Sequence, residues 1–297
     1  MPQGADLEAM AQALEASGGY RVLRRLTPRA GRTLPAGATA RSGLLVDVET
    51  TGLDPARHEI IELAMVPFTY GLDGEIYEVA EPFHGLRQPS HPIPPKAIAI
   101  HGVTDEMVAG RSIDPEAVSR FAAGASLVIA HNAAFDRRFL ERYCQTFSTK
   151  AWGCSMSQID WAGDGHEGVK LVHLAAGSGF FYEKHRAVHD CMAAIELLAR
   201  PLRTSGRPAL AHLLEEARRP SWRIWAENSP FDLKDVLKAR GYRWNGEAGV
   251  GPRAWFLDVD EGGRECELTF LRDEIYQGEI ELPVRRIDAY DRFSERA

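Results

Sequence analysis

The sequence predicts an α/β fold in which helices flank a mixed sheet, followed by a small α+β module. Two observations lead to this prediction. Short apolar segments with strand character, such as 44–49 and 127–130, alternate along the chain with helical segments such as 187–199. A stretch rich in Pro, Gly, Ser and Arg at 199–208 is typical of a linker, and a second series of short elements follows it.

Length and composition set the outer limits of the interpretation. The chain has 297 residues, of which 44% are hydrophobic, enough for one large domain and a smaller one. No apolar run approaches the roughly 20 residues of a membrane-spanning helix, and the N-terminus lacks the apolar centre of a signal peptide. We therefore expect a cytoplasmic protein with no membrane partner. The net charge of −7 predicts that any contact with a polyanion is local.

The cysteines predict no metal or disulfide framework. The chain has 4 of them, and their spacing fits neither a disulfide scaffold nor a C-x-x-C zinc site. We expect them to be reduced packing residues.

Residues 1–42 are expected to form an N-terminal helix and a basic arm. The helix covers 7–16 and ends at Gly18-Gly19, and several arginines interleaved with prolines follow it. Two interpretations of the arm stay open: it touches a phosphate backbone, or it packs as a solvated segment on the main domain.

Residues 43–200 form the predicted larger domain. Three strands should make a meander, because turn residues separate segments of alternating polarity. A Pro-rich stretch then leads to a short helix capped by Thr104. The expected strands are 44–49, 59–70, 75–83 and 127–130, and the expected longer helices are 114–124, 131–147, 169–177 and 187–199.

Residues 209–297 form the predicted C-terminal module, with 201–208 as the linker. Its expected elements are a helix at 209–219, an extended segment at 222–226, a helix capped by Asp232 that ends at Gly241, a strand at 253–259, a helix at 266–276 and a last strand near 279–287. The stretch 237–245 mixes aromatic and basic residues that would either stack on bases or pack in the module's core. The role of the module stays open.

The first strand of the larger domain carries two acids, Asp47 and Glu49. Residues i and i+2 of a strand share one face, so both carboxylates point the same way. Neighbouring carboxylates repel each other unless cations lie between them, and divalent ions with oxygen ligands suit that role. From this spacing alone, an acidic edge strand that faces solvent is an equally good interpretation.

Three separated motifs favour the metal site. They are DVETTGL at 47–53, HNAAFD at 131–136 and HRAVHD at 185–190, and HGVT at 101–104 lies between the first two. In their order and their surrounding pattern they resemble the DEDDh (DnaQ-like) exonucleases, such as the proofreading epsilon subunit of bacterial DNA polymerase III, RNase T and oligoribonuclease. The resemblance covers about 43–200 and implies an RNase H-like exonuclease domain.

The resemblance also implies a site with two ions, Mg²⁺ or Mn²⁺, that clamp the scissile phosphate. Asp47 would bridge the two metals. Glu49 and Asp190 would bind the metal that carries the attacking water, and Asp136 would support the second metal, largely through water.

His185 would act as the general base, since a histidine accepts protons near neutral pH. The alternative subclass has a tyrosine four residues before the last aspartate, where this chain has Arg186, so the histidine subclass fits better. His189 offers a second imidazole. We expect it to have no chemical role, because its neighbour Asp190 must face the metals and adjacent helix residues point apart.

The other motif residues are expected to bind substrate. Leu53 resembles the family's wedge against the 3'-terminal base, and the backbone amides before it would face the terminal nucleotide. For each of these residues, turn formation or core packing explains its presence equally well. The full set is Thr50, Thr51, Gly52, Leu53, His101, Thr104, Asn132 and Phe135.

Together these features predict a metal-dependent 3'-5' exonuclease that acts on single-stranded DNA ends and releases nucleoside 5'-monophosphates in repair or proofreading. Replication or repair proteins are the implied protein partners, although no clear clamp-binding motif follows residue 200. An exoribonuclease of the RNase T and oligoribonuclease type is the first alternative, because sugar preference depends on contacts to the 2'-hydroxyl. A non-catalytic nucleic-acid-binding module is the second, and the intact acid and histidine set weighs against it.

Overall fold

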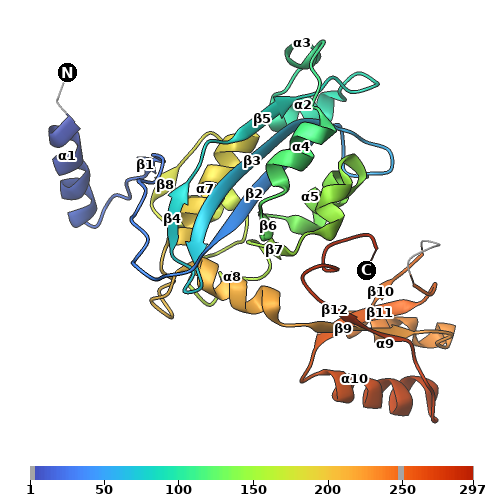
Figure 1. Cartoon of the computed structure of the whole chain (residues 1–297). Coiled ribbons are helices and arrows are strands. Elements are labelled where there is room, and N and C mark those ends of the chain that lie inside the picture. Colours follow the sequence, from blue (N-terminus) through green and yellow to red (C-terminus); the bar gives the residue numbers. More distant parts are fainter. Residues whose placement is uncertain (1–3, 247–250, 297) are drawn as a thin grey trace.

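The computed structural model describes residues 4–246 and 251–296, and a mixed sheet forms the centre of its larger domain (Figure 1). The strands lie in the order β4-β3-β2-β6-β7, and β5 also pairs with β3. β2 is antiparallel to β3 and parallel to β6. The strands are β2 (Ala40–Thr50), β3 (Ile60–Gly71), β4 (Ile76–Val79), β5 (Phe83–Leu86), β6 (Leu127–Ala130) and β7 (Trp152–Cys154).

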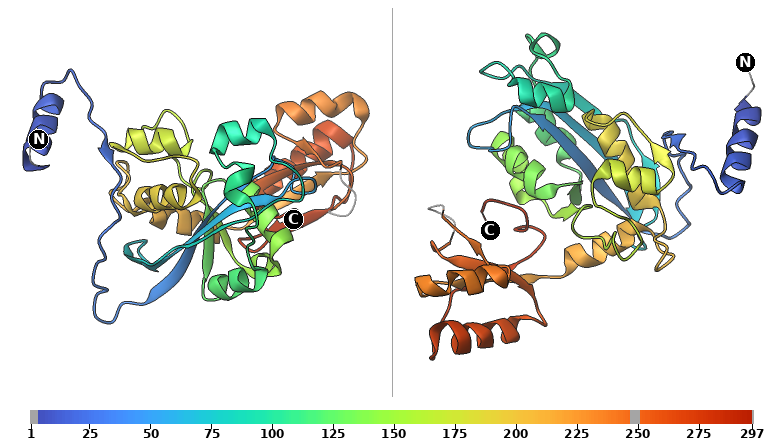
Figure 2. Two further views of the ribbon diagram at one scale, coloured as in Figure 1. Left: turned by 90° about the horizontal axis from the view of Figure 1, so that it is seen from above. Right: turned by 180° about the vertical axis from the view of Figure 1, so that it is seen from behind.

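Helices cover both faces of this sheet (Figures 1 and 2). On β2, Leu45 packs in the core that contains α7, whereas Leu44 and Val46 pack in the core that contains α4 and α5. Because side chains alternate along a strand, Asp47 and Glu49 share the α7 face. The helices are α4 (Pro115–Ala122), α5 (Ala133–Tyr143), α6 (Leu171–Gly177), α7 (Ala187–Ala199) and α8 (Ala209–Arg218).

Two short helices, α2 (Pro95–His101) and α3 (Asp105–Val108), pack at one end of β3 around a small core of their own. α2 ends at Gly102, whose φ of 69° is a left-handed conformation that glycine adopts without strain. Thr104 precedes α3 as expected, but its side chain makes no capping hydrogen bond, so that part of the prediction was wrong.

The N-terminal segment forms α1 (Gly4–Ala16), which projects from the body, and β1 (Arg24–Arg25), which pairs in parallel with β8 (Phe180–Phe181) (Figures 1 and 2). The arginines of the arm bind acids of the same chain: Arg24 pairs with Glu8 and Glu15 in α1. The other pairs are Arg25 with Glu183, Arg29 with Glu196, and Arg32 with Glu75. This pairing favours the interpretation that the arm packs on the protein.

The C-terminal module contains a second, antiparallel sheet with strand order β10-β11-β9-β12. Ile224, Leu237 and Leu271 belong to its small core, which joins one face of the sheet to the helices. The elements are β9 (Ser221–Ala226), η2 (Phe231–Leu233), α9 (Lys234–Ala239), β10 (Arg243–Trp244), β11 (Trp255–Asp260), α10 (Arg264–Phe270), the π-helix η3 (Leu271–Tyr276) and β12 (Val284–Ile287). Across the described ranges, no helix is long and apolar enough to span a bilayer.

Three further local predictions were wrong. The strand expected at 75–83 is two strands, β4 and β5, interrupted before Phe83 by Pro82, which has no N–H to donate to the ladder. The helix expected at 131–147 ends at Tyr143, and a 3₁₀ turn, η1 (Gln145–Thr149), follows. Asp232 does not cap α9, because it lies inside η2.

Helix α8 packs differently from the expectation that it belongs to the C-terminal module. Its residues Leu210, Leu213 and Leu214 enter the core around α7, because its apolar side matches the sheet surface beside that helix. The division of the chain at 1–42, 43–200, 201–208 and 209–297 stays a prediction. We propose a last boundary near 219–220, where the second sheet begins.

Candidate active site

Three carboxylates converge on the α7 face of the central sheet. Asp47 and Glu49 come from β2, and Asp190 comes from the first turn of α7. One oxygen from each lies within 4.8 Å of the other two. The first turn of α7 reaches β2 because Cys191 and Ile195 anchor that helix in the core beneath the sheet.

Asp136 belongs to the first turn of α5, in the layer of helices on the other face. Its side chain is 4% exposed and accepts a hydrogen bond of 3.2 Å from the Val48 N–H. That N–H is available because β6 pairs with β2 only as far as Leu45. The short strand β6 therefore leaves room for a carboxylate beside the acidic pair.

The four carboxylates do not ionise independently. Burial, and then the charges of Asp136, Asp190 and Glu49, raise the pKa of Asp47 well above its ordinary value. Burial and the same kind of repulsion raise the pKa of Glu49 to about 8, and burial raises that of Asp136 to about 7. Burial also raises the pKa of Asp190. Such a cluster is stable in its ionised form only when cations lie between its members.

The donor set fits hard divalent ions. All four side chains offer oxygen atoms, which Mg²⁺ and Mn²⁺ prefer, whereas zinc prefers nitrogen or sulfur. Within the described part of the chain, His185 is the only basic side chain in ion-pair distance of the three clustered acids, and it lies 3.9 Å from Glu49. The cluster therefore holds more negative charge than the protein itself neutralises.

Two groups hold Asp190 in place. The Tyr182 hydroxyl donates to Oδ1 at 2.9 Å, and the Arg186 N–H donates to Oδ2 at 3.0 Å. The Arg186 bond is predictable, since an acid in a first helical turn binds free backbone N–H groups. Tyr182 was missed by the sequence analysis, because it lies eight residues before Asp190, directly after β8, and no motif includes it.

The two histidines that flank this turn point in different directions. His185 Nδ1 lies 3.9 Å from Glu49 Oε1, on the side of the carboxylate cluster. His189 is exposed, and its Nδ1 lies 3.7 Å from Glu183 Oε2, outside the cluster. His185 has a φ of 59°, a left-handed conformation that is uncommon for a residue with a side chain. Only one of the two imidazoles is therefore near the acids.

A second buried acid, Glu62, was also missed by the sequence analysis. It is 2% exposed, lies opposite Glu49 in the β2–β3 register, and binds His84 Nε2 at 2.8 Å. Its charge contributes to the raised pKa of both Asp47 and Glu49. The available signal was an acid in the middle of the apolar run 60–68, where a charge needs a partner.

The residues expected to bind substrate have different surroundings. Thr51 Oγ1 accepts the Glu59 N–H at 3.0 Å, and Thr50 Oγ1 donates to the Gly52 carbonyl at 2.7 Å, so both hydroxyls stabilise the turn. Leu53 is 82% exposed at the end of that turn, which is unusual for a leucine and leaves it free to contact a ligand.

His101 is buried, and its Nδ1 accepts the Val103 N–H at 3.0 Å; burial lowers its pKa, and the charge of Glu62 opposes that shift. Asn132 is exposed directly before α5. Phe135 is half-buried and packs against Phe139, with 5.0 Å between the ring centroids. Of this set, Leu53 and Asn132 are the most accessible side chains.

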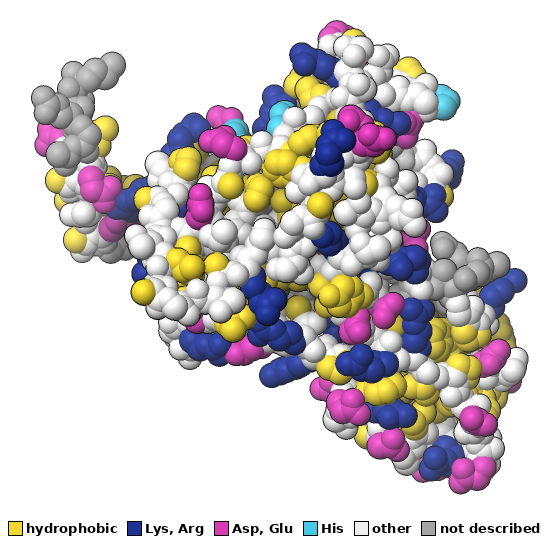
Figure 3. All heavy atoms as spheres, in the orientation of Figure 1, with side chains coloured by type: hydrophobic (Ala, Val, Ile, Leu, Met, Phe, Trp, Pro, Cys, Tyr) yellow, Lys and Arg dark blue, Asp and Glu magenta, His cyan; other side chains and the backbone are white. Residues whose placement is uncertain are grey.

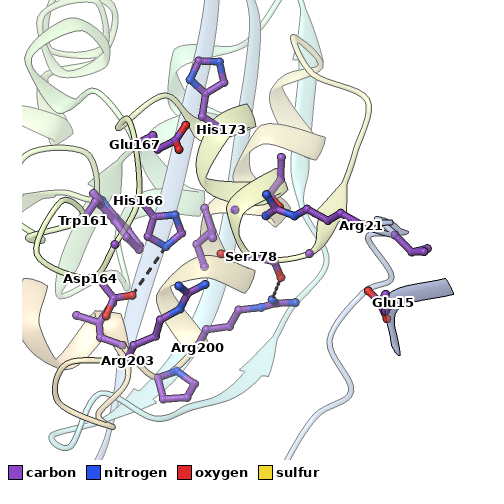
Figure 4. Close-up of a pocket in the computed structure, with 18 residues that line it drawn as sticks. Glu15, Arg21, Trp161, Asp164, His166, Glu167, His173, Ser178, Arg200 and Arg203 are labelled. Atoms are coloured by element: carbon purple, nitrogen blue, oxygen red, sulfur yellow. Dashed lines mark hydrogen bonds and ion pairs between the residues drawn. The ribbon is translucent and has the colours of Figure 1, made fainter. Parts of the chain in front are cut away.

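A separate polar pocket of about 820 Å³ lies between α6, the loop before it and the N-terminal arm (Figure 4). Arg21, Arg200 and Arg203 come together there with His166. Arg21 and Arg200 already donate to main-chain carbonyls at the end of α6. None of the predicted catalytic residues lines this pocket, so we assign it no part in the reaction.

Comparison with known proteins identifies the family. The exonuclease model RNase_T matches residues 44–198. Exodeoxyribonuclease 10 of Escherichia coli K12 is 31% identical over 169 residues, which are 54% of this chain and 69% of that protein. A DNA polymerase III subunit epsilon-like protein of Rhodobacter capsulatus is 31% identical over 191 residues, 59% of this chain and 26% of that protein.

A solved structure of TM-score 0.50 supports the fold. E. coli exonuclease I in complex with a dA16 oligonucleotide covers 79% of this chain and 71% of its own, with 14% identity and a TM-score of 0.50. Exonuclease X in complex with 5' overhanging duplex DNA covers 59% of this chain and 99% of its own, with 30% identity and a TM-score of 0.43. The matched region, 44–198, contains all four carboxylates and His185. The chain belongs to the DEDDh, DnaQ-like exonuclease family and is a 3'-5' exonuclease.

Proposed function

We propose that this exonuclease is metal-dependent, degrades single-stranded DNA from the 3' end and releases nucleoside 5'-monophosphates in repair or proofreading. The observation that carries the proposal is the group of Asp47, Glu49 and Asp190 within 4.8 Å, with His185 at 3.9 Å from Glu49. A group of like charges supports metal binding, and the nearby imidazole supports hydrolysis.

In this proposal Asp47, Glu49, Asp136 and Asp190 hold two divalent ions, Mg²⁺ or Mn²⁺. The bound ions would neutralise the scissile phosphate and make water more acidic. The protein does the remaining work. Tyr182 and the Arg186 N–H fix both oxygens of Asp190, so its carboxylate cannot rotate away from Asp47 and Glu49.

His185 takes the proton of the attacking water in this proposal. Its position on the Glu49 side of the cluster supports that role, because a general base must lie within hydrogen-bond reach of the water. The 3' oxygen of the penultimate nucleotide is the leaving group, so the released nucleotide keeps the phosphate at its 5' position. Leu53, exposed beside the turn at 50–53, would separate the terminal base from its neighbour.

DNA is proposed as the substrate because exodeoxyribonuclease 10 is named for it and because the exonuclease X and exonuclease I structures contain it. The test is product analysis on single-stranded, duplex and mismatched DNA and on matched RNA, all labelled at the 5' end, with Mg²⁺, Mn²⁺ or a chelator. We expect a ladder of 5'-labelled strands, with nucleoside 5'-monophosphates as the second product, only when metal is present.

Digestion that resists the chelator, or strands with 3'-phosphates, would contradict the mechanism. A preference for RNA would replace DNA by RNA as the substrate and leave the chemistry unchanged. The variant Asp190→Asn is the control for a contaminating nuclease, since it removes one ligand and preserves the side-chain shape.

A further inference from the structure

We propose that the C-terminal module forms a second binding site for single-stranded nucleic acid, which holds the strand at a distance from its 3' end. The site is a groove of about 840 Å³ between the module's sheet and the start of α5. Arg223, Arg243 and Phe256 line it from the sheet, and Asn132 and Arg138 line it from the larger domain. The direction of the strand, with its 3' end at the carboxylates, rests on the proposed function. The binding site itself does not.

The alternation of side chains explains why one face of this sheet is open. Ile224 and Leu257 point into the core that the module's helices cover. Arg223 and Phe256, the residues directly before them, therefore point to the opposite face, and Arg243 pairs in register with Phe256. The helices α9 and α10 lie against the first face (Figure 1).

The open face carries the chemistry that binds single strands. The Arg223 and Arg243 guanidinium groups lie 4.5 Å and 4.8 Å from the centre of the Phe256 ring. Flat aromatic and guanidinium surfaces stack on bases of any sequence, and the same guanidinium groups bind phosphates. The side chain of Arg243 is 64% exposed, so a strand in the groove would reach it.

The charge of the groove also favours a polyanion. Arg223 and Arg243 share a single carboxylate, that of Asp258, at 2.7 Å and 3.2 Å. Arg138 adds an exposed cation from α5. The described lining also includes Arg292 and Glu295, so positive side chains still outnumber negative ones in the groove. This excess occurs in a chain of net charge −7, and Figure 3 shows dark blue Lys and Arg side chains, with magenta Asp and Glu side chains among them, near the junction of the two parts. Such a surface agrees with the expectation that any polyanion contact is local.

The groove begins close to the catalytic carboxylates. Asn132 lines it, and the Asp136 N–H donates to the Asn132 carbonyl at 3.3 Å, so the two residues are one helical turn apart. A strand whose 3' end lies at the carboxylates would therefore enter the groove after a few nucleotides.

A set of hydrogen bonds around the buried Arg137, which we call the clasp, fixes the two walls of the groove. Arg137 is 0% exposed and donates to the carbonyls of Ala289, Tyr290 and Arg292. The Trp152 N–H also donates to the Ala289 carbonyl, at 2.8 Å. Three consecutive residues of α5 thus serve three sites: Asp136 the carboxylates, Arg137 the clasp and Arg138 the groove.

The test is equilibrium binding of fluorescent single strands of about 5 and about 20 nucleotides, in chelator so that nothing is hydrolysed. The test variant combines Arg138→Gln with Arg243→Gln. The matched control combines Arg120→Gln with Arg272→Gln, which removes the same charge from a helix of the larger domain and from the module, outside the groove.

We expect the native protein to bind the long strand more tightly than the short one. The test variant should lose at least about tenfold in affinity for the long strand, with a shallower salt dependence, and keep its affinity for the short strand. The control variant should match the native protein with both strands.

Equal affinity for both lengths in the native protein, or an unchanged affinity of the test variant for the long strand, would overturn the proposal. After either result, a protein partner would be the next ligand to test for the groove. Because binding is measured without turnover, the groove proposal can fail while hydrolysis of short strands persists, and it can hold if the hydrolytic proposal fails.

Discussion

Two buried charged sites lie on neighbouring residues of α5, and their electrostatics are opposite. Asp136 belongs to a cluster of like charges, and burial raises its pKa to about 7. Arg137 belongs to the clasp, where it binds Glu141 at 2.7 Å and three main-chain carbonyls. Burial alone would raise the pKa of Glu141, but hydrogen bonds from Arg296, Ser294 and Arg137 lower it.

The difference distinguishes a site proposed to bind metal ions from a site that stabilises the fold. In the clasp, opposite charges and backbone acceptors meet the donors of Arg137, so burial is compensated within the protein. In the carboxylate cluster, the repulsion between ionised carboxylates must be compensated by bound cations. Mutations should therefore have opposite effects on the stability of the metal-free protein at the two sites.

The largest effect is expected from Asp47→Asn. It removes a ligand of the cluster, so turnover should fall below detection, while the metal-free protein should melt at a higher temperature because one repulsive charge is gone. Turnover of 5'-labelled strands and thermal melting in chelator are the measurements. Glu78→Gln, which neutralises an exposed acid on β4 of the same sheet, is the control and should change neither. Residual hydrolysis by Asp47→Asn would mean that the site lies elsewhere.

The next effect distinguishes the two histidines. His185→Ala should lower kcat by roughly 10² to 10⁴, the usual range for a general base, whereas His189→Ala, which loses only an exposed contact to Glu183, should be mild. In the native enzyme the rate should fall on the acid side as an imidazole becomes protonated, and His185→Ala should abolish or move that limb. The opposite ranking would transfer the role to His189.

The third prediction concerns the clasp. Arg137→Met should lower the free energy of unfolding by about 3–5 kcal/mol, because it leaves the carbonyls of Tyr290 and Arg292 without their donor and removes one of the three partners of Glu141. Chemical denaturation measures this. Arg142→Met is the matched control: it breaks an exposed pair with Glu295 on the same helix and should cost less than about 1 kcal/mol. Equal costs would show that the clasp contributes no more than a surface pair.

The smallest effect is a dependence of stability on pH. The folded protein keeps protons on Glu49 up to about pH 8 and on Asp136 up to about pH 7, whereas unfolded carboxylates lose them near pH 4. The retained protons therefore contribute to the free energy of unfolding. Their contribution is complete below about pH 4 and is lost as the pH rises through 7 to 8. Melting in chelator should therefore shift to lower temperature between pH 5 and pH 8.

Metal provides the check on that prediction. Mg²⁺ or Mn²⁺ binds the ionised carboxylates, so the rise in melting temperature on adding metal should be larger at pH 8 than at pH 6. Glu49→Gln should flatten the pH dependence in chelator. A metal effect that is independent of pH would contradict the raised pKa values.

The placement of the proposed catalytic residues was predictable, because motifs and local geometry define it. Alternation along β2 places Asp47 and Glu49 on one face, and α7 begins at Ala187 as expected, which brings Asp190 into its first turn. The orientation of His189 away from the side of Asp190 also follows from local helix geometry. These features need only a few neighbouring residues, so a single sequence contains them.

The partners of these residues were not predictable, because they come from distant segments. Tyr182 and Glu62 carry no motif, and their contacts depend on how β8 and β3 pack. The apolar side of α8 was recognisable, but periodicity shows which side is buried and not which core receives it. The clasp joins Arg137 to residues near 290, and no pattern in the sequence predicts that contact.

That separation has a consequence for the order of assembly during synthesis. Between 152 and 155 residues separate Arg137 from the three carbonyls it binds. At about 5–20 residues per second, a ribosome needs roughly 8 to 30 s to make that stretch. The central sheet can form in this interval, but the guanidinium of Arg137 stays hydrated until its acceptors have been synthesised. The clasp should therefore be a late step in folding, and the nascent enzyme acquires its active-site residues before it acquires the second wall of its groove.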